Sequence, residues 1–337
     1  MRSNRRLPIS CVLLAAAWVL ATGQAARADP AAWLREGWTK TDFSKTRIGW
    51  NEILSGGPPK DGIPSIDSPV FKNVADGSEL TDRDPVIGLA IGGDARAYPL
   101  RILTWHEIVN DTVGGVPVAV TYCPLCNSAV VFNRRAAGLV LDFGTTGKLR
   151  NSDLVMYDRQ TESWWQQFTG EALVGKLVGT ELKMFPARLE SFAEFKARHP
   201  AGKVLIPNNP RLRDYGRNPY VGYDGSAAPF LYRGDFPKGI EPMARVVVVR
   251  PPGDGPKAVA LELLRKKGRI ALGEIELHWR AGQASALDHQ EVAKGRDVGT
   301  VSAYRTTADG VREEVTYDVT FAFVVFAFHP DLHILKD

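Results

Sequence analysis

Cysteine is scarce in this sequence, which has three in 337 residues. Cys11 falls in an N-terminal apolar run, so the body of the chain keeps only Cys123 and Cys126, three positions apart. So few cysteines exclude a fold held together by several disulfides across long loops. A second Cys-x-x-Cys pair is also absent, which excludes a four-cysteine zinc ribbon.

Long apolar runs are equally rare. Residues 11–22 form one, between a basic start (Arg2, Arg5 and Arg6) and the small-x-small sequence at 26–28. This pattern predicts a signal peptide over residues 1–28 and a secreted or periplasmic protein. The next longest run, 315–328, has about 14 residues, and a membrane-spanning helix needs ~20. We therefore expect a core strand there and no membrane span in the mature chain.

The chain lacks a strong excess of either charge. Four of its 42 basic residues and none of its 38 acidic residues lie in the predicted signal, so the mature chain has 38 of each. A neutral surface without long basic runs argues against nucleic acid and anionic membranes as partners. A small molecule or another protein remains as the partner class.

Alternating apolar residues and Gly-rich turns predict an α+β fold that is mostly β. We expect a lead segment at 29–84, a first β-rich half at 85–206, a connection at 207–242 and a second β-rich half at 243–337. The expected strands are 86–91, 95–99, 116–122, 128–133, 139–143, 154–157, 246–249, 258–264 and 273–279. The expected helices are 30–37, 100–111 and 190–199.

The two halves show a weak internal similarity. Each begins with a strand, a Gly-Asp turn and a second strand, and each closes on an aromatic-rich segment before His-Pro, at His199 and at His329. The pattern favours two degenerate repeats, over about 85–200 and 243–330, although chance similarity is the alternative. In this alignment Arg280 and Gln283 replace Cys123 and Cys126.

The segment Thr121–Ser128, TYCPLCNS, contains the strongest chemical signal. Two sulfurs on a tight turn suit a metal ion, and His106 and His329 are the candidate further ligands, with His199 a weaker one. Soft thiolates with imidazole favour copper or zinc. The pair could instead be a redox disulfide, or a structural disulfide between Cys123 and Cys126 that fixes the turn.

A polar stretch at 147–167 is a second candidate site. It carries Trp164 and Trp165 beside a set of polar side chains, Arg150, Asn151, Asp153, Asp158 and Glu162. Aromatic faces next to polar groups can bind a small ligand. The alternative is a hydrogen-bonded turn network with both tryptophans in the core.

Several motifs together resemble one family of secreted prokaryotic proteins, labelled domain of unknown function 3179. They are HEIVND at 106–111, TYCPLCNSA at 121–129, SDLVMYDRQTESWW at 152–165 and FHPD at 328–331. The resemblance covers most of the mature chain and implies no particular activity. It supports His106, Cys123, Cys126 and His329 as positions of interest.

Three functions follow from these patterns. The first is a periplasmic metal-binding protein centred on Cys123 and Cys126, with copper or zinc and a potential redox role. The second is a thiol–disulfide oxidoreductase. The third is a non-catalytic module that binds a ligand or partner and uses the cysteines as a structural disulfide. The sequence does not decide whether the protein is an enzyme.

Overall fold

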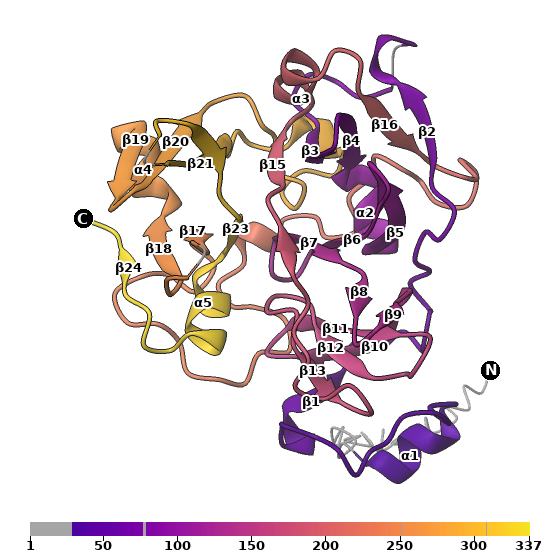
Figure 1. Cartoon of the computed structure of the whole chain (residues 1–337). Coiled ribbons are helices and arrows are strands. Elements are labelled where there is room, and N and C mark those ends of the chain that lie inside the picture. The colour runs from indigo at the N-terminus through magenta and orange to yellow at the C-terminus, as the bar shows by residue number, and fades with distance from the viewer. Residues whose placement is uncertain (1–28, 77–78, 252, 308) are drawn as a thin grey trace, which may run out of the picture.

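A computed structural model describes residues 29–76, 79–251, 253–307 and 309–337. The predicted signal peptide and Cys11 lie outside the described residues. The predicted α+β, mostly β fold is confirmed, because strands alternate with a few short helices throughout (Figure 1). No helix of the described part combines the length and apolar character that crossing a membrane requires.

In the described residues of the lead segment and first half there are three α-helices and sixteen strands. The helices are α1 (Pro30–Arg35), α2 (Leu100–His106) and α3 (Phe192–Arg198). The strands are β1 (Ile53–Ser55), β2 (Val70–Asn73), β3 (Pro85–Ile91), β4 (Asp94–Pro99), β5 (Ile108–Val113), β6 (Val116–Cys123), β7 (Ser128–Asn133), β8 (Arg135–Ala136), β9 (Leu139–Val140), β10 (Phe143–Arg150), β11 (Asp153–Asp158), β12 (Trp164–Gln166), β13 (Ala172–Val174), β14 (Met184–Phe185), β15 (Arg188–Ser191) and β16 (Lys203–Ile206).

The second half contains two α-helices and eight strands. The helices are α4 (Leu261–Lys267) and α5 (Ala322–Phe328). The strands are β17 (Arg245–Val249), β18 (Lys257–Ala260), β19 (Arg269–Leu272), β20 (Ile275–Arg280), β21 (Thr300–Thr306), β22 (Arg312–Glu314), β23 (Tyr317–Phe321) and β24 (Ile334–Leu335).

The two halves share an order of elements and a pairing of strands. In the first half, sheet β15-β3-β4-β16-β2 lies next to sheet β14-β7-β6-β5, and β16 runs parallel to β4. In the second half, sheet β23-β17-β18-β24 accompanies sheet β19-β20-β21-β22, and β24 runs parallel to β18. Helices α2 and α4 occupy equivalent places, as do α3 and α5. The origin of this likeness in a duplication stays a prediction.

A third sheet is inserted into the first half only. Its order is β1-β10-β11-β12-β13; strands β10 to β13 lie between β7 and β14 in the sequence, whereas β1 comes from the lead segment. The N-terminal part of the lead segment, with α1, packs at its outer end, at the bottom of Figure 1, whereas β2 of the same segment lies at the top. Trp38 and Trp164 are fully buried there in a separate aromatic cluster.

Four expected elements differ from the structure, the first being the strand expected at 139–143, which is divided between the end of β9 at Val140 and the start of β10 at Phe143. The helix expected at 100–111 ends at His106, and the strand β5 follows. The segments 258–264 and 315–328 each begin as a strand (β18, β23) and continue as a helix (α4, α5). Their apolar residues are buried in both parts, and a short, fully buried apolar run fits a strand or a helix equally well.

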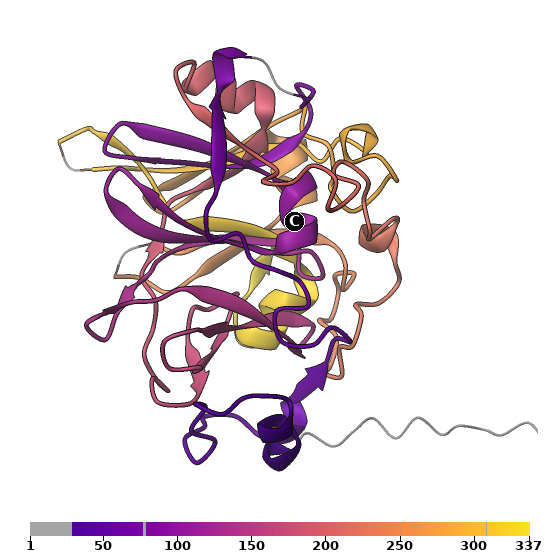
Figure 2. The same cartoon turned by 90° about the vertical axis from the view of Figure 1, so that its right-hand side faces the viewer.

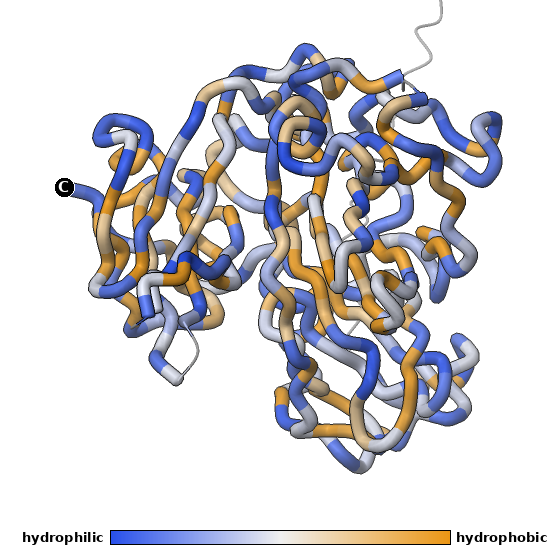
Figure 3. Tube along the Cα trace, turned by 45° about the horizontal axis from the view of Figure 1, so that its top comes forward, coloured by the Kyte–Doolittle hydropathy of each residue, from blue (hydrophilic) through white to orange (hydrophobic). Residues whose placement is uncertain are grey.

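One hydrophobic core connects the two halves. Val120 of β6 and Val247 of β17 belong to the same cluster of buried side chains, and both are inaccessible to solvent. Figure 3 shows apolar stretches along the strands, and Figure 2 shows the strands of both halves layered against each other. The halves are therefore packed together through apolar contact.

Strand β23 of the second half also forms hydrogen bonds with the cysteine turn of the first. Asn127 Nδ2 donates to the Val319 carbonyl at 2.7 Å, and Thr320 Oγ1 donates to the Cys126 carbonyl at 2.8 Å. The buried Asp318 carboxylate accepts from Ser128 Oγ at 2.6 Å and from the next backbone N–H at 2.9 Å. Hydrogen bonds from β23 thus hold the cysteine turn, in addition to the bonds within the β6–β7 hairpin.

We expect Asp318→Ala to lower the free energy of unfolding by about 3 kcal/mol, because it leaves two buried donors without an acceptor. Asp235→Ala, at an exposed position, is the matched control and should change stability little. Urea unfolding of both variants measures this. Equal stability of the two variants would contradict the role assigned to Asp318.

Candidate metal centre

The Cys-Pro-Leu-Cys sequence forms a tight turn between β6 and β7. The Cys126 N–H donates to the Cys123 carbonyl at 3.2 Å, and Asn127 closes the turn with a positive φ of 50°. Both sulfurs approach the Ser152 carbonyl, at 4.0 Å for Cys123 and 3.6 Å for Cys126. The two thiols therefore face the same neighbour.

Asp153 is the third member of the group. One ligand atom each from Cys123, Cys126 and Asp153 lie within 4.8 Å of one another, and all three residues are buried. Asp153 follows the turn at Asn151 and Ser152, which have positive φ angles of 52° and 65° as in a type I′ hairpin. This hairpin of β10 and β11 brings the carboxylate to the sulfurs.

The Asp153 carboxylate is oriented by fixed donors. Oδ2 accepts from Gln166 Nε2 at 2.6 Å and from the Phe168 N–H at 3.0 Å. Oδ1 is buried and has no hydrogen-bond partner among the described residues. A carboxylate held through one oxygen, with the other free, is the usual arrangement of a metal ligand supported by a second layer of hydrogen bonds.

Burial weakens the acidity of all three groups. It raises the pKa of both thiols and raises the pKa of Asp153 to about 6. The structure has both cysteines as free thiols. Thiol–disulfide exchange needs a thiolate with a lowered pKa, whereas a bound cation would itself remove these protons. The group of two thiols and a carboxyl could therefore hold a metal ion.

Glu107 is a fourth acidic group close by. It ends α2 with a positive φ of 58°, and its side chain is 7% exposed. Burial, and then the charge of Asp153, raises the pKa of Glu107 to about 8. At the equivalent end of α4 stands Gly268, with a φ of 69°. Glycine adopts this conformation without strain, so the first half keeps a glutamate there despite a backbone cost.

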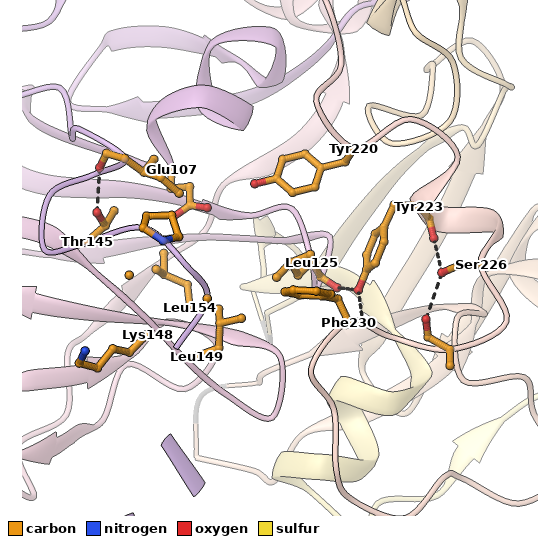
Figure 4. Close-up of a pocket in the computed structure, with 15 residues that line it drawn as sticks. Glu107, Leu125, Thr145, Lys148, Leu149, Leu154, Tyr220, Tyr223, Ser226 and Phe230 are labelled. Carbon is orange, nitrogen blue, oxygen red and sulfur yellow. Dashed lines mark hydrogen bonds between the residues drawn. The ribbon is translucent and has the colours of Figure 1, made fainter. Parts of the chain in front are cut away.

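Glu107 lines a pocket of about 460 Å³ next to the cysteine turn (Figure 4). Its wall is mostly apolar and includes Leu125 and Leu154, neighbours in sequence of Cys126 and Asp153. Tyr220 and Tyr223, from the long connection, face it, and the Tyr220 hydroxyl points toward Glu107 in Figure 4. A mostly apolar cavity with few polar groups suits a small, largely apolar ligand.

The Tyr223 side of this pocket is tied to the turn. The Tyr223 hydroxyl donates to the Leu125 carbonyl at 3.0 Å and accepts from the Phe230 N–H at 3.2 Å. The connection at 207–242 is therefore more than a linker, because its aromatic residues form one wall of the site.

The histidines expected as ligands lie elsewhere. The ring nitrogens of His106 are hydrogen-bonded to the Pro64 carbonyl and the Tyr215 hydroxyl, each at 2.7 Å. His329 lies beside the Phe168 ring, at 5.9 Å between centroids. Among the described residues, neither belongs to the group around the sulfurs. Asp153, rather than either histidine, is the residue that lies with the two sulfurs.

His199 is also absent from the group. Its Nε2 lies 3.0 Å from Arg198 Nη1, and its backbone N–H donates to the Phe195 carbonyl as the cap of α3. His329 caps α5 in the same way. The shared His-Pro sequences thus mark equivalent helix ends.

Most of the polar side chains predicted at 147–167 make contacts within the fold, although Asp153 lies with the sulfurs and Lys148, Leu149 and Leu154 line the pocket. Trp164 and Trp165 are fully buried, and Trp165 Nε1 donates to Asp158 at 2.9 Å. Arg150 pairs with Glu52, and Glu162 pairs with Lys60, both at 2.7 Å. Asn151 forms the hairpin turn. The interpretation as a turn network with core tryptophans describes these contacts, and the seven residues do not form one ligand-binding surface.

Sequence reasoning missed Glu107, Tyr220 and Tyr223 as lining residues. Glu107 could have been found by aligning the two halves, because it corresponds to Gly268 of the second half. The tyrosines carry no spacing signal, since they reach the site from a connection without regular strands.

Comparison with known proteins identifies the family. The family model described as "Protein of unknown function (DUF3179)" matches residues 60–332, most of the chain, so the chain belongs to this family. The resemblance inferred from the motifs is confirmed at this level. Neither the search of curated proteins nor that of solved structures returned a match.

The buried Glu107 gives a prediction for stability against pH in metal-free protein. Its pKa rises from 4.5 when exposed to about 8 in the fold. The folded state thus retains a proton that the unfolded state has released, and stability falls by roughly 1.4 kcal/mol per pH unit between these values. This contribution is complete below pH 4.5 and is lost as the pH rises through 8.

Glu107→Gln should remove this contribution, because glutamine stays neutral. Urea unfolding with chelator present, from pH 5 to 8, would show a flatter curve than the parent protein. Glu274→Gln, at an exposed position, is the control and should keep the parent slope. Identical slopes for all three proteins would refute the buried, neutral state of Glu107.

Proposed function

We propose that this DUF3179 protein is a periplasmic zinc protein that binds a small, mostly apolar molecule beside the ion. The observation that carries the proposal is the buried group formed by Cys123, Cys126 and Asp153 within 4.8 Å, with one Asp153 oxygen unpaired. The signal-like residues 1–28 support secretion.

The ligand types favour zinc over copper. Copper(I) prefers ligands that are all soft, whereas zinc accepts thiolate sulfur together with carboxylate oxygen. Three protein ligands leave the fourth tetrahedral position to water or a bound molecule, which is the pattern of reactive rather than structural zinc sites. Zinc would act there as a Lewis acid.

The protein's own residues would support this role. Gln166 and the Phe168 N–H orient Asp153, and Tyr220 and Tyr223 form an aromatic wall of the pocket. Glu107 places a carboxyl group in the same pocket, where it can exchange a proton with a bound molecule. Glu107 is therefore the residue that we expect to distinguish an enzyme from a simple binding protein.

Copper with a redox role is the second candidate, supported by the paired thiols. Elemental analysis separates the two, because it identifies the metal directly. A thiol–disulfide oxidoreductase is less well supported, because burial raises the pKa of both thiols.

Elemental analysis of protein purified without chelators should find about one zinc per chain. Cys123→Ser, Cys126→Ser and Asp153→Asn should each lose most of it, because each removes a ligand. Gln166→Ala should weaken zinc affinity roughly 10- to 100-fold, because Asp153 then loses a hydrogen bond that fixes its orientation. Competition with a chromogenic chelator measures this affinity.

His106→Gln and Asp158→Asn are the matched controls, since they remove a predicted ligand and a buried carboxylate outside the group. Both should retain the metal. Absence of metal, with two cysteines that react with an alkylating reagent only after reduction, would overturn the proposal in favour of a disulfide.

A further inference from the structure

A second cavity lies where the two halves meet, away from the pocket beside the cysteines. It encloses about 570 Å³, a volume typical of small-molecule sites. The first half contributes Thr169 and residues 181–184, and the second half contributes Arg250, Thr316 and His329. None of these residues lines the first pocket.

Arg250 at the end of β17 is the notable side chain in this cavity. Its guanidinium lies on the Phe168 ring, 4.6 Å from the centroid, and Nη2 donates to the Phe168 carbonyl at 3.2 Å. Nη1 is buried and has no hydrogen-bond partner among the described residues. A buried cationic donor without a partner has lost its hydrogen bonds to water and has gained none in the protein, which costs free energy.

The nearby acidic groups do not supply a hydrogen-bond acceptor for Arg250 Nη1. The charge of Asp318 acts on Arg250, but its two oxygens accept from Ser128 Oγ and the Ala129 N–H. Asp254 lies at the exposed edge of the cavity and pairs with Lys257 at 2.9 Å. Glu181 is exposed at the same edge. Arg250, which lines the cavity, thus keeps one donor without an acceptor among the described residues.

The remaining lining indicates what kind of molecule fits. Thr169, Thr316 and His329 offer further polar groups, while Leu182 and Met184 supply an apolar wall. Arginine binds carboxylate and phosphate through paired N–H groups. We propose that this cavity binds a small organic anion, whose carboxylate or phosphate pairs with Arg250 and whose apolar body packs on the leucine and methionine.

His329 is one of the residues that line this cavity. It was expected as a metal ligand, and it instead lies on the wall of the anion cavity next to Phe168. The second half therefore contributes a site of its own at the interface, although Arg280 and Gln283 stand where the first half has its cysteines.

Isothermal titration with benzoate and phenyl phosphate tests the proposal, with benzamide as the neutral analogue of benzoate. At least one anion should bind saturably, and benzamide should not. The tighter anion identifies the head group as carboxylate or phosphate. No saturable binding of either anion, or equal binding of benzamide, would overturn the proposal.

Arg250→Gln should weaken the anion roughly 10- to 100-fold, because it removes a charge-assisted hydrogen bond. Lys257→Gln, which removes a cation at the edge, is the control and should bind nearly as the parent does. Unchanged affinity in Arg250→Gln would refute the role of the arginine.

A measurement on the parent protein covers the case in which Arg250→Gln does not fold. Benzoate or phenyl phosphate should shift the ring NMR signal of His329, assigned with His329→Gln, and leave that of His278 in place. A titration without a shift of His329 would refute this location. Cys123→Ser should keep the anion affinity, which separates failure of this site from failure of the metal centre.

Discussion

The contact between the cysteine turn and strand β23 is the constraint on which the candidate site depends. The Cys126 carbonyl accepts from Thr320 Oγ1 at 2.8 Å and from the Phe321 N–H at 3.2 Å. The second half thereby covers the turn, and both thiols become buried. The chemistry of the first half thus depends on a strand almost 200 residues further along the chain.

Four of the eight non-glycine residues with positive φ in the described part of the chain lie around the same turn. Glu107, Asn127, Asn151 and Ser152 all have positive φ angles, which cost of order 1 kcal/mol or more each for residues other than glycine. The equivalent end of α4 uses Gly268. Each of these residues positions a group of the site. Glu107 places its own carboxyl group, Asn127 closes the cysteine turn, and Asn151 and Ser152 place the Ser152 carbonyl oxygen near the sulfurs. Tertiary packing therefore has to offset the backbone free-energy cost of these positive φ angles.

The sequence predicted those features that depend on local pattern. Cys123 and Cys126 were found because two thiols on one turn need no tertiary information. Asp153 was grouped with the tryptophans instead, because its approach to the sulfurs depends on how the β10–β11 hairpin lies against the turn. His106 illustrates the opposite error, since its position before the cysteine strand suggested proximity while both ring nitrogens bond elsewhere. Buried runs such as 315–328 were assigned as one strand because apolar character alone does not reveal where a strand becomes a helix.

Phe168 connects the two sites in physical terms. Its N–H donates to Asp153 Oδ2, and its carbonyl accepts from Arg250 Nη2. Its ring also lies under the guanidinium and beside His329. A shift of this one residue would therefore change both the carboxylate of the candidate metal centre and the arginine donor at the proposed anion cavity. The interface between the halves, rather than either half alone, determines the geometry of both sites.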